Sequence, residues 1–397
     1  MAFGLEVNNK RKVYLDYAAT TPVDPVVVQA MLPCFEENWG NPSSLYASGR
    51  TANALMNTAR EDIAQVLNCK QHEIIFTSGG TESDNLAIKG VALLAQQRGK
   101  GNHIIVSAIE HHAVLHAAEY LQNFGIETTY LPVNSQGLVE PAQVERAIIP
   151  GRTALVSVMY ANNEIGTVQP LAQIAAITRR YKVPLHTDAV QAGGQLELDV
   201  QKLGVDLLSL SSHKFYGPKG IGILYVRHGL AMLYQQQGGS QERRRRAGTE
   251  NVPYIVGTAQ ALTLAEKGRE QEVQRLRLLR DRLKDGILSR IPDVRLNGSW
   301  LDKERLAGNF NVSLAGVEGE GLLQALDLAG IEASNGSACN VGSIEPSHVL
   351  KALGLPDAET AGTLRFSLGK YTTEADIDYV LEKLPGIVER MRALSLV

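Results

Sequence analysis

The sequence predicts an α/β protein in which a large domain with a mostly parallel sheet is followed by a smaller α+β domain. Two observations predict this fold class. Short β-rich runs alternate with helical segments up to about residue 258, and long, charged amphipathic segments follow. The 397 residues are 44% hydrophobic and 20% charged, so the chain can bury one large and one smaller core. We place the large domain at residues 14–258 and the small domain at residues 1–13 and 259–397.

The β-rich runs of the large domain are mostly apolar and are separated by helical segments. In the segment 81–98, Ala87, Val91 and Leu94 recur at i, i+4 and i+7, which marks one face of a helix. Strand–helix alternation of this kind predicts a parallel sheet covered on both faces. Such sheets bind ligands beyond the carboxyl ends of their strands. The predicted strands span residues 73–77, 103–107, 154–159, 184–188, 206–211 and 221–226.

The small domain is predicted from two amphipathic helices. One begins after about residue 258, and another closes the chain at residues 373–393, after a cap formed by Thr372 and Thr373. Each has an apolar stripe at helical spacing that we expect to face a core. The stripes consist of Leu276, Leu279, Leu283 and Ile287 in the first helix, and of Ile377, Val380, Leu384 and Ile387 in the second.

Charge and sulfur content exclude several classes of protein. The net charge is −3, with 39 basic and 42 acidic residues, which predicts no nucleic-acid partner and no binding to an acidic membrane surface. We find no apolar run near the length of a membrane span and no apolar core of signal length at the N-terminus. Cys34, Cys69 and Cys339 form no CxxC pair, which favours a reducing compartment and predicts a cytoplasmic protein. His112 and His116 are spaced i, i+4 but lack an evident third ligand, so we predict no metal site.

The strand at 73–77 ends in a glycine-containing turn, Thr-Ser-Gly-Gly-Thr-Glu-Ser. Gly80 and Thr81 would open the next helix, where backbone N–H groups and the helix dipole attract an anion such as a phosphate. A plain strand–helix turn with a threonine cap explains this motif equally well.

Two further strand ends carry charged residues. Asp188 ends the strand at 184–188, where it either caps the next helix or faces a cationic atom of a ligand. Lys214 follows the strand at 206–211 and is either a solvated lysine or a Schiff-base former. Because the two lie about one strand–helix–strand unit apart, both should reach one rim of the sheet. A phosphate loop, an aspartate and a Schiff-base lysine on one rim together predict pyridoxal phosphate as cofactor.

The segment 331–348 carries Cys339 among small and polar residues, which is typical of an exposed, mobile loop. This setting favours a reactive thiol over an incidental surface cysteine. Cys34 and Cys69 instead follow apolar helical patterns and are predicted to be structural.

Motifs that run nearly from end to end resemble those of cysteine desulfurases in the class V aminotransferase family, which have the pyridoxal phosphate fold type I. The spacing of the loop after GSAC resembles the group I branch, which serves iron–sulfur assembly and nitrogen fixation. The matching stretches are YLDYAATTP at 14–22, GNPSS at 40–44, TSGGTESDN at 77–85, EHHAVL at 110–115, NNEIGT at 162–167, HTDAVQ at 186–191, SSHKFYGPKG at 211–220, RAGTEN at 246–251, GSAC at 336–339, EPSHVL at 345–350 and LRFSLGKYTTEADID at 364–378.

The resemblance implies a role for individual residues. Lys214 matches the Schiff-base lysine, Cys339 the persulfide-forming cysteine, and His111 the imidazole stacked on the cofactor, a candidate acid/base. Asn163 and Arg365 match the groups that bind the substrate carboxylate. A guanidinium suits that task because it forms two bonds to a carboxylate, whereas Asn163 also reads as a turn residue. The remaining matches are Asp188 and Gln191 at the ring nitrogen and phenolic oxygen, Gly80, Thr81, Ser211 and His213 around the phosphate, and Thr249 as a phosphate contact from the other subunit of a homodimer.

The predicted activity is conversion of L-cysteine to L-alanine with a persulfide left on Cys339, which passes sulfur to an acceptor such as an iron–sulfur scaffold protein. A selenocysteine lyase or another aminotransferase-like enzyme with the same cofactor is the alternative. A rival of a different class is a non-catalytic sulfur carrier on this fold. The basic run Arg243–Arg246 is either a solvated loop or helps to position the substrate or the adjacent subunit.

Overall fold

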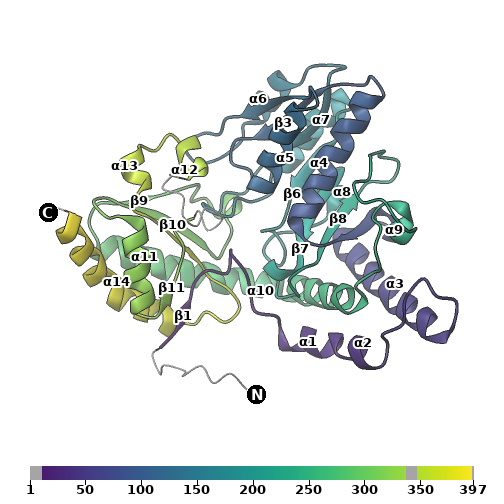
Figure 1. The fold of residues 1–397 in the computed structure, drawn as a ribbon. Coiled ribbons are helices and arrows are strands. Elements are labelled where there is room, and N and C mark those ends of the chain that lie inside the picture. The colour runs from purple at the N-terminus through teal and green to yellow at the C-terminus, as the bar shows by residue number, and fades with distance from the viewer. Residues whose placement is uncertain (1–10, 337–346, 396–397) are drawn as a thin grey trace.

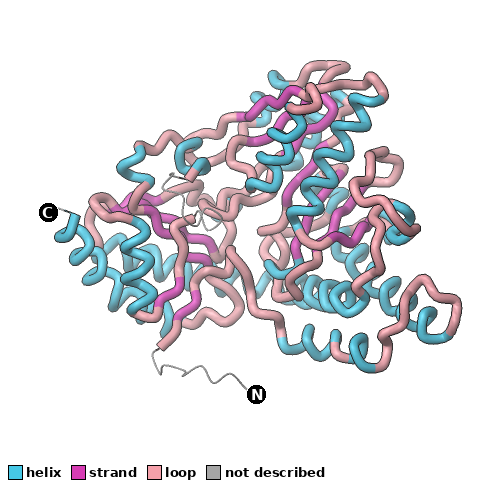
Figure 2. The backbone as a smooth tube through the Cα atoms, in the orientation of Figure 1, coloured by secondary structure: helices cyan, strands magenta, loops and turns pink. Residues whose placement is uncertain are grey.

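The computed structural model describes residues 11–336 and 347–395. Two groups of helices and strands lie side by side, one around a large sheet and one around smaller sheets (Figure 1). We call them the large lobe and the small lobe. The N-terminal segment, drawn in purple, runs between them (Figure 1). Figure 2 shows that strands form the centre of each lobe and that helices lie outside them.

The large lobe is built on a seven-stranded sheet of order β2-β8-β7-β6-β5-β3-β4. Strand β8 pairs antiparallel with both of its neighbours, whereas the other pairs are parallel. The predicted mostly parallel sheet is therefore confirmed. The strands are β2 (Ile74–Thr77), β3 (His103–Ser107), β4 (Glu127–Leu131), β5 (Thr153–Ser157), β6 (Leu185–Asp188), β7 (Leu207–Ser211) and β8 (Gly222–Val226).

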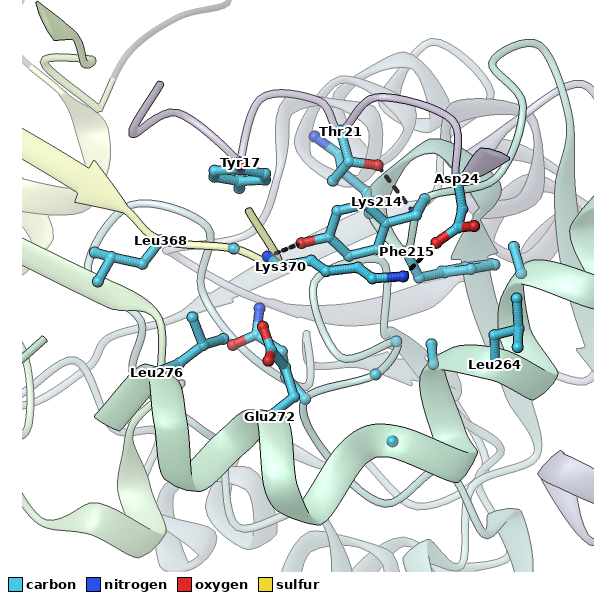
Figure 3. Close-up of a pocket in the computed structure, with 18 of the residues that line it drawn as sticks. Tyr17, Thr21, Asp24, Lys214, Phe215, Leu264, Glu272, Leu276, Leu368 and Lys370 are labelled. Carbon is cyan, nitrogen blue, oxygen red and sulfur yellow. Dashed lines mark hydrogen bonds and ion pairs between the residues drawn. The ribbon is translucent and has the colours of Figure 1, made fainter. Parts of the chain in front are cut away.

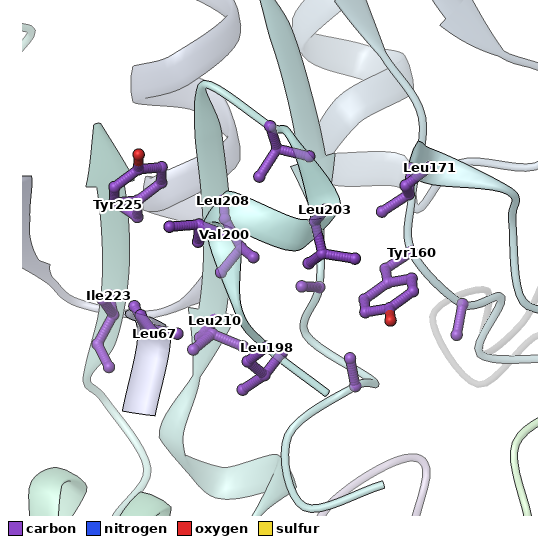
Figure 4. Packing of buried hydrophobic residues seen from close by; sticks show 14 of the residues in the cluster. Leu67, Tyr160, Leu171, Leu198, Val200, Leu203, Leu208, Leu210, Ile223 and Tyr225 are labelled. Carbon is purple, nitrogen blue, oxygen red and sulfur yellow. The ribbon is translucent and has the colours of Figure 1, made fainter. Parts of the chain in front are cut away.

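Helix α4 (Gly80–Gln97) covers one face of this sheet, and two of the three residues of its predicted apolar stripe lie in the core, whereas Leu94 is only half-buried. Ala87 is 0% and Val91 4% exposed, in a core with strand residues such as Leu155 and Leu224. The opposite face buries a second cluster, in which Leu208, Leu210 and Tyr225 of the sheet meet residues such as Leu203 (Figure 4). Burial on both faces matches the mainly apolar strand sequences.

The small lobe contains a three-stranded sheet of order β12-β10-β9 and a parallel pair, β1 with β11. Both predicted amphipathic helices form, and their apolar stripes share one core. The first belongs to α10 (Val252–Arg290) and the second is α14 (Glu374–Ser395). The strands are β1 (Val13–Tyr14), β9 (Val294–Leu296), β10 (Asn309–Leu314), β11 (Ile331–Glu332) and β12 (Thr363–Ser367).

Helix α10 links the two lobes. It packs on α1 and α3 in the large lobe and on α14 in the small lobe (Figure 1). The boundary placed at residues 258 and 259 falls inside this continuous helix, so the division into domains stays a prediction. The other helices are α1 (Pro25–Met31), α2 (Pro33–Glu36), α3 (Ala47–Leu67), α5 (His112–Gln122), α6 (Pro141–Ala147), α7 (Leu171–Tyr181), α8 (Val200–Leu203), α9 (Gln241–Arg244), α11 (Gly319–Leu328), α12 (His348–Ala352) and α13 (Asp357–Thr360), with short 3₁₀ turns η1 (Gln71–Glu73), η2 (Ser212–Lys214) and η3 (Asp302–Glu304).

Among the residues that the structure describes, no helix is both long and apolar enough to cross a membrane.

Candidate active site

A cavity of about 380 Å³ lies at the carboxyl ends of the parallel strands, between the two lobes. The segments after β2, β3, β5, β6 and β7 each contribute to its wall, and β12 adds a residue from the small lobe. This is the place where a parallel sheet is expected to bind a ligand. It brings together ten predicted site residues: Gly80, Thr81, His111, Asn163, Asp188, Gln191, Ser211, His213, Lys214 and Arg365.

One end of the cavity is shaped to receive an anion. Gly80 is the first residue of α4, an 18-residue helix, so the N-terminal dipole of α4 points at this end. A Cβ atom on Gly80 would lie 2.7 Å from Cγ2 of Val190 and 3.5 Å from Cβ of Ser211, so only glycine fits here without displacement. Gly80, Thr81, Ser211 and His213 also line an adjoining open pocket.

Lys214 reaches the cavity from η2, directly after β7. Its Nζ donates hydrogen bonds to the carbonyl oxygens of Ala18, at 2.5 Å, and Ala19, at 2.7 Å. Nε2 of Gln191 donates to the same carbonyl of Ala18 at 3.1 Å. These two carbonyl acceptors were not predicted from the sequence. The motif YLDYAATTP marked the segment, but alanine side chains give no sign of a polar contact.

Asp188 lies at the end of β6 and is 5% exposed. Its Oδ1 accepts a hydrogen bond from the backbone N–H of Val190 at 2.9 Å. Burial raises the pKa of Asp188 to about 6, while the Val190 N–H group and the charge of Lys214 oppose that rise. The carboxylate therefore caps the turn that follows β6, which is one of the two alternatives that the sequence left open, and it lines the same cavity as Lys214.

His111 is the N-cap residue of α5, and its Nδ1 accepts the backbone N–H of Ala113 at 3.1 Å. Burial, followed by the charge of Lys214, lowers the pKa of His111 to about 4. The ring is therefore neutral at neutral pH. Because Nδ1 is an acceptor, the ring proton resides on Nε2.

Arg365 comes from β12 of the small lobe and is 2% exposed. Its Nη2 lies 2.6 Å from Oδ1 of Asp16, and its Nη1 donates to the backbone oxygen of Asn163 at 3.0 Å. Its Nε is buried and has no hydrogen-bond partner within the described residues. Asp16 was not predicted as a site residue, although it belongs to the motif YLDYAATTP. Asn163 was predicted to bind the substrate carboxylate. In the structure, its backbone carbonyl oxygen accepts a hydrogen bond from the guanidinium of Arg365.

Two predicted residues are not placed at this cavity. Thr249 is exposed and lines a separate cavity of about 230 Å³ with Ser78 and Arg246. It is absent from the described wall of the main cavity in its own chain. Cys339 lies outside the described residues, and Gly336, the last described residue before it, lines the main cavity.

The basic run is not uniformly solvated. Arg243 and Arg244 are exposed, whereas Arg246 binds the Glu82 carboxylate through Nε at 2.9 Å and Arg245 donates to the Ile74 carbonyl at 3.1 Å. Two of the four arginines therefore fix the segment before Thr249 to the strand and helix that flank the anion-binding end.

Lys214 and Gln191 also line a second cavity of about 400 Å³, between α10 and the N-terminal segment. Figure 3 shows its apolar wall, to which Leu264 and Leu276 contribute, and its ion pair between Lys370 and Asp24. Lys214 therefore lines both cavities.

Within the described ranges, no group of three or more histidine, cysteine and acidic side chains could hold a metal ion. His112 stacks on His116, with ring centroids 5.0 Å apart, and lies 4.8 Å from His348. Cys34 is buried and Cys69 half-buried, and burial raises the pKa of each thiol, so the structural interpretation of both stays a prediction that their burial supports.

The sequence pattern of the aminotransferase class-V family matches residues 13–380. The chain belongs to this family. It is 52% identical over 393 residues to cysteine desulfurase IscS of Methanosarcina thermophila, covering 99% of this chain and 96% of that protein. It is 49% identical over 385 residues to cysteine desulfurase IscS of Clostridium botulinum, covering 97% and 96%.

Solved structures of the same family have the same fold. A NifS-like protein superposes with a TM-score of 0.89 at 37% identity, over 96% of this chain and all 100% of that one. SspA in complex with cysteine superposes with a TM-score of 0.79 at 37% identity, over 91% of this chain and 100% of that one. The predicted family and fold type are therefore confirmed.

Pyridoxal phosphate is the cofactor of cysteine desulfurases in this family, and the prediction of this cofactor is confirmed. The residues present fit it. The anion-binding end has the N-terminus of α4, where a Cβ atom on Gly80 would collide with Val190. Lys214 supplies an amine, Asp188 a buried carboxylate, and His111 a neutral ring on one cavity wall.

Proposed function

We propose that this protein is a cysteine desulfurase that converts L-cysteine to L-alanine and retains the sulfur as a persulfide on Cys339. One observation carries the proposal: the amine of Lys214, the carboxylate of Asp188 and the guanidinium of Arg365 line one cavity. Relatives named cysteine desulfurase are about half identical to this chain in sequence over nearly its whole length, and they support the same activity.

The large lobe would hold the cofactor. The cofactor phosphate would bind at the N-terminus of α4 and would be surrounded by Gly80, Thr81, Ser211 and His213. Asp188 would pair with the ring nitrogen, Gln191 with the phenolic oxygen, and His111 would stack on the ring. When bound, pyridoxal phosphate supplies an aldehyde that links to amines and a ring that withdraws electrons from the α-carbon.

The small lobe would bring the substrate carboxylate to Arg365. The buried Nε of Arg365 has no hydrogen-bond partner within the described residues, and a carboxylate satisfies a guanidinium through two parallel bonds. Asn163, whose carbonyl already holds Nη1, would be the second group at this carboxylate. Anchoring here fixes the direction of the Cα–H bond. The Nζ of Lys214 would then remove the α proton.

The sulfur would move in one displacement at Cys339. Its thiolate attacks the substrate sulfur, so that the S–S bond forms while the Cβ–S bond breaks. The electron pair of the broken bond stays on the carbon side, which takes up protons to become alanine. His111 carries its proton on Nε2 and would act first as a hydrogen-bond donor to the reacting groups.

The biological setting that we propose is a cytoplasmic homodimer that supplies sulfur for iron–sulfur cluster assembly. Thr249 is exposed and lies outside the main cavity of its own chain, as expected for a residue that contacts the cofactor phosphate of a partner subunit. The arginine contacts that fix the segment before Thr249 fit this role. An acceptor protein would take the persulfide sulfur from the 331–348 segment.

Three measurements test the activity. The purified protein, loaded with pyridoxal phosphate and given L-cysteine and a thiol reductant, should form alanine and sulfide in equal amounts. Lys214→Ala should lose the visible absorption of the lysine-linked cofactor, and Cys339→Ser should bind the cofactor and cysteine yet release no sulfide. Sulfide output from Cys339→Ser equal to that of the wild type would move the nucleophile elsewhere.

A further inference from the structure

A cluster of buried ionisable groups lies at the wall of the main cavity, which Asp84 and Asp188 both line, and the proposed reaction does not use most of this cluster. Asp84 of α4 is 1% exposed, and His186 of β6 and Glu110 before α5 are both 0% exposed. Asp188 lies two residues after His186 on β6, so both side chains point to the same face of the sheet. Helix α4 packs on β6, and Asp84 lies next to both residues.

The imidazole of His186 is neutral. Its Nδ1 lies 2.8 Å from Oγ of Ser157 on β5, and its Nε2 lies 3.0 Å from Oγ of Ser209 on β7. Burial lowers the pKa of His186 to about 3. Its Nε2 lies 3.6 Å from Oδ1 of Asp84, but a neutral ring gives that carboxyl group no compensating charge.

The surroundings of the two aspartates differ. Asp188 accepts a backbone N–H bond from Val190, and its negative charge interacts with the amine of Lys214. Asp84 has neither a backbone N–H bond nor a cation. Its Oδ1 has no hydrogen-bond partner within the described part of the chain, and only a hydrogen bond from the Ser209 hydroxyl opposes the rise in its pKa, to which the charges of Asp188 and Glu110 add. The third acid, Glu110, accepts bonds at 2.6 Å from Ser107 Oγ and from the Met159 N–H group.

Two carboxyl groups in one buried site cannot both ionise at low cost, and the charge stays where a cation and an N–H donor stabilise it. We infer that Asp84 is a positioning residue for Asp188: it remains a neutral carboxylic acid, so that the single negative charge of the pair resides on Asp188 beside the cavity. Burial and the charge of Asp188 both raise the pKa of Asp84 well above its usual value.

The role assigned to Asp188 rests on the proposed function, but the ionisation state of Asp84 does not. A neutral Asp84 leaves the charge of Asp188 undivided, to meet a protonated ring nitrogen of the cofactor. An ionised Asp84 would instead place a second negative charge beside the first at the cavity wall, and Asp188 would bind a proton of its own more readily.

The first test compares the thermal stability of the wild-type holoenzyme with that of Asp84→Asn across pH. A carboxyl group whose pKa is raised on folding gives full stability below its unfolded value, and stability falls as pH rises towards the folded value. The asparagine of Asp84→Asn cannot ionise, so this variant does not lose stability in this way as pH rises. We expect Asp84→Asn to melt at a higher temperature than the wild type near pH 8, with the gap closing towards about pH 5.

The opposite pattern would overturn the inference. If Asp84 were ionised and paired with a charged His186, Asp84→Asn would melt at a lower temperature than the wild type near pH 8, and this deficit would persist at pH 5 and shrink only below about pH 4. Equal melting temperatures at every pH would also contradict a neutral Asp84, because the removal of a buried acid would then have changed nothing.

A spectroscopic test does not depend on catalysis. The infrared spectrum of the wild-type holoenzyme minus that of Asp84→Asn should contain the C=O stretch of a protonated carboxylic acid at neutral pH. Asp188→Asn is the matched control, because it removes the neighbouring charge and should lower the pH at which that band disappears. Burial also raises the pKa of Glu110 to about 8, so Glu110 gives a second such band, and the assignment to Asp84 comes from the difference between the wild-type and Asp84→Asn spectra.

The absence of such a band from the wild-type spectrum would refute the neutral acid. The pH midpoint of the cofactor's visible band should be shifted in Asp188→Asn and unchanged in Asp84→Asn. If the protein formed no sulfide from cysteine, the proposed function would fail while the melting and infrared results on Asp84 would stand.

Discussion

The buried ion pair between Arg60 and Glu242 ties the segment before Thr249 to the large lobe, and its removal should be costly. Both side chains are 3% exposed. Glu242 accepts bonds from Arg60 Nη1 at 2.9 Å and Nη2 at 2.5 Å, and from the Phe76 N–H group at 3.0 Å. Glu242→Ala leaves the Arg60 charge buried without its partner. Breaking a buried pair in this way costs about 3–5 kcal/mol.

The assay is the thermal unfolding midpoint of the holoenzyme in a double-mutant cycle. Glu242→Gln keeps an acceptor for Phe76 but loses the charge, and Arg60→Met keeps the apolar volume. Each single variant should unfold well below the wild type, and the double variant should recover most of the difference, because a buried pair can often be replaced by neutral groups at little cost.

A surface pair provides the control. Arg180 and Glu145 lie 3.1 Å apart with 61% and 38% of their side chains exposed, so Glu145→Ala should change stability by less than about 1 kcal/mol. If Glu242→Ala melted like Glu145→Ala, or if the double variant lost the full sum of both single losses, the pair would not anchor this segment. Weaker cofactor retention in Glu242→Ala would link the anchor to the proposed role of Thr249.

Three other changes have defined outcomes. Gly80→Ala places a Cβ atom 2.7 Å from Val190 and should weaken cofactor binding at least about tenfold, measured by titrating the visible band, because the phosphate end must open. Arg365→Lys loses the two-bond fork and should lower kcat/KM for cysteine by about 10–100-fold, with the cofactor spectrum unchanged; an unaltered KM and kcat would move the carboxylate elsewhere. His186, whose pKa is lowered on folding to about 3, adds stability at neutral pH that is lost as pH falls from about 6.5 towards that value, by about 1.4 kcal/mol per pH unit. His186→Asn should therefore flatten the acid side of the stability profile, and a slope equal to that of the wild type would contradict a neutral ring.

The alternation of strands and helices was sufficient to predict the sheet and the strand ends that line the main cavity, whereas other wall residues, such as His111 and Arg365, were predicted only from the family resemblance. Asp188 at the end of β6 and Lys214 directly after β7 both line the cavity, because the carboxyl ends of parallel strands lie at the same edge of a sheet. Strand β4 was not predicted. Its sequence, Glu-Thr-Thr-Tyr-Leu, is mostly polar because it forms the exposed edge of the sheet.

The contacts that sequence reasoning missed are those with no local signal. Asp16 pairs with Arg365 across 349 positions, and the carbonyls of Ala18 and Ala19 meet Lys214 across 196 and 195. Periodicity describes which face of an element is apolar, but it does not show which distant segment will cover a polar atom. A backbone carbonyl is also present at every residue, so its use as an acceptor leaves no trace in residue type.

These missed contacts all lie in the N-terminal segment, and they explain how two lobes can form one site. Residues 16–24 contact the large lobe through Lys214 and His213, and the small lobe through Arg365 and Lys370. The amine proposed to move the α proton and the guanidinium proposed to hold the carboxylate are therefore positioned by the same short stretch of chain. Because catalysis depends on holding such groups within a fraction of an ångström, a change in this stretch would alter the distance between them without touching either residue.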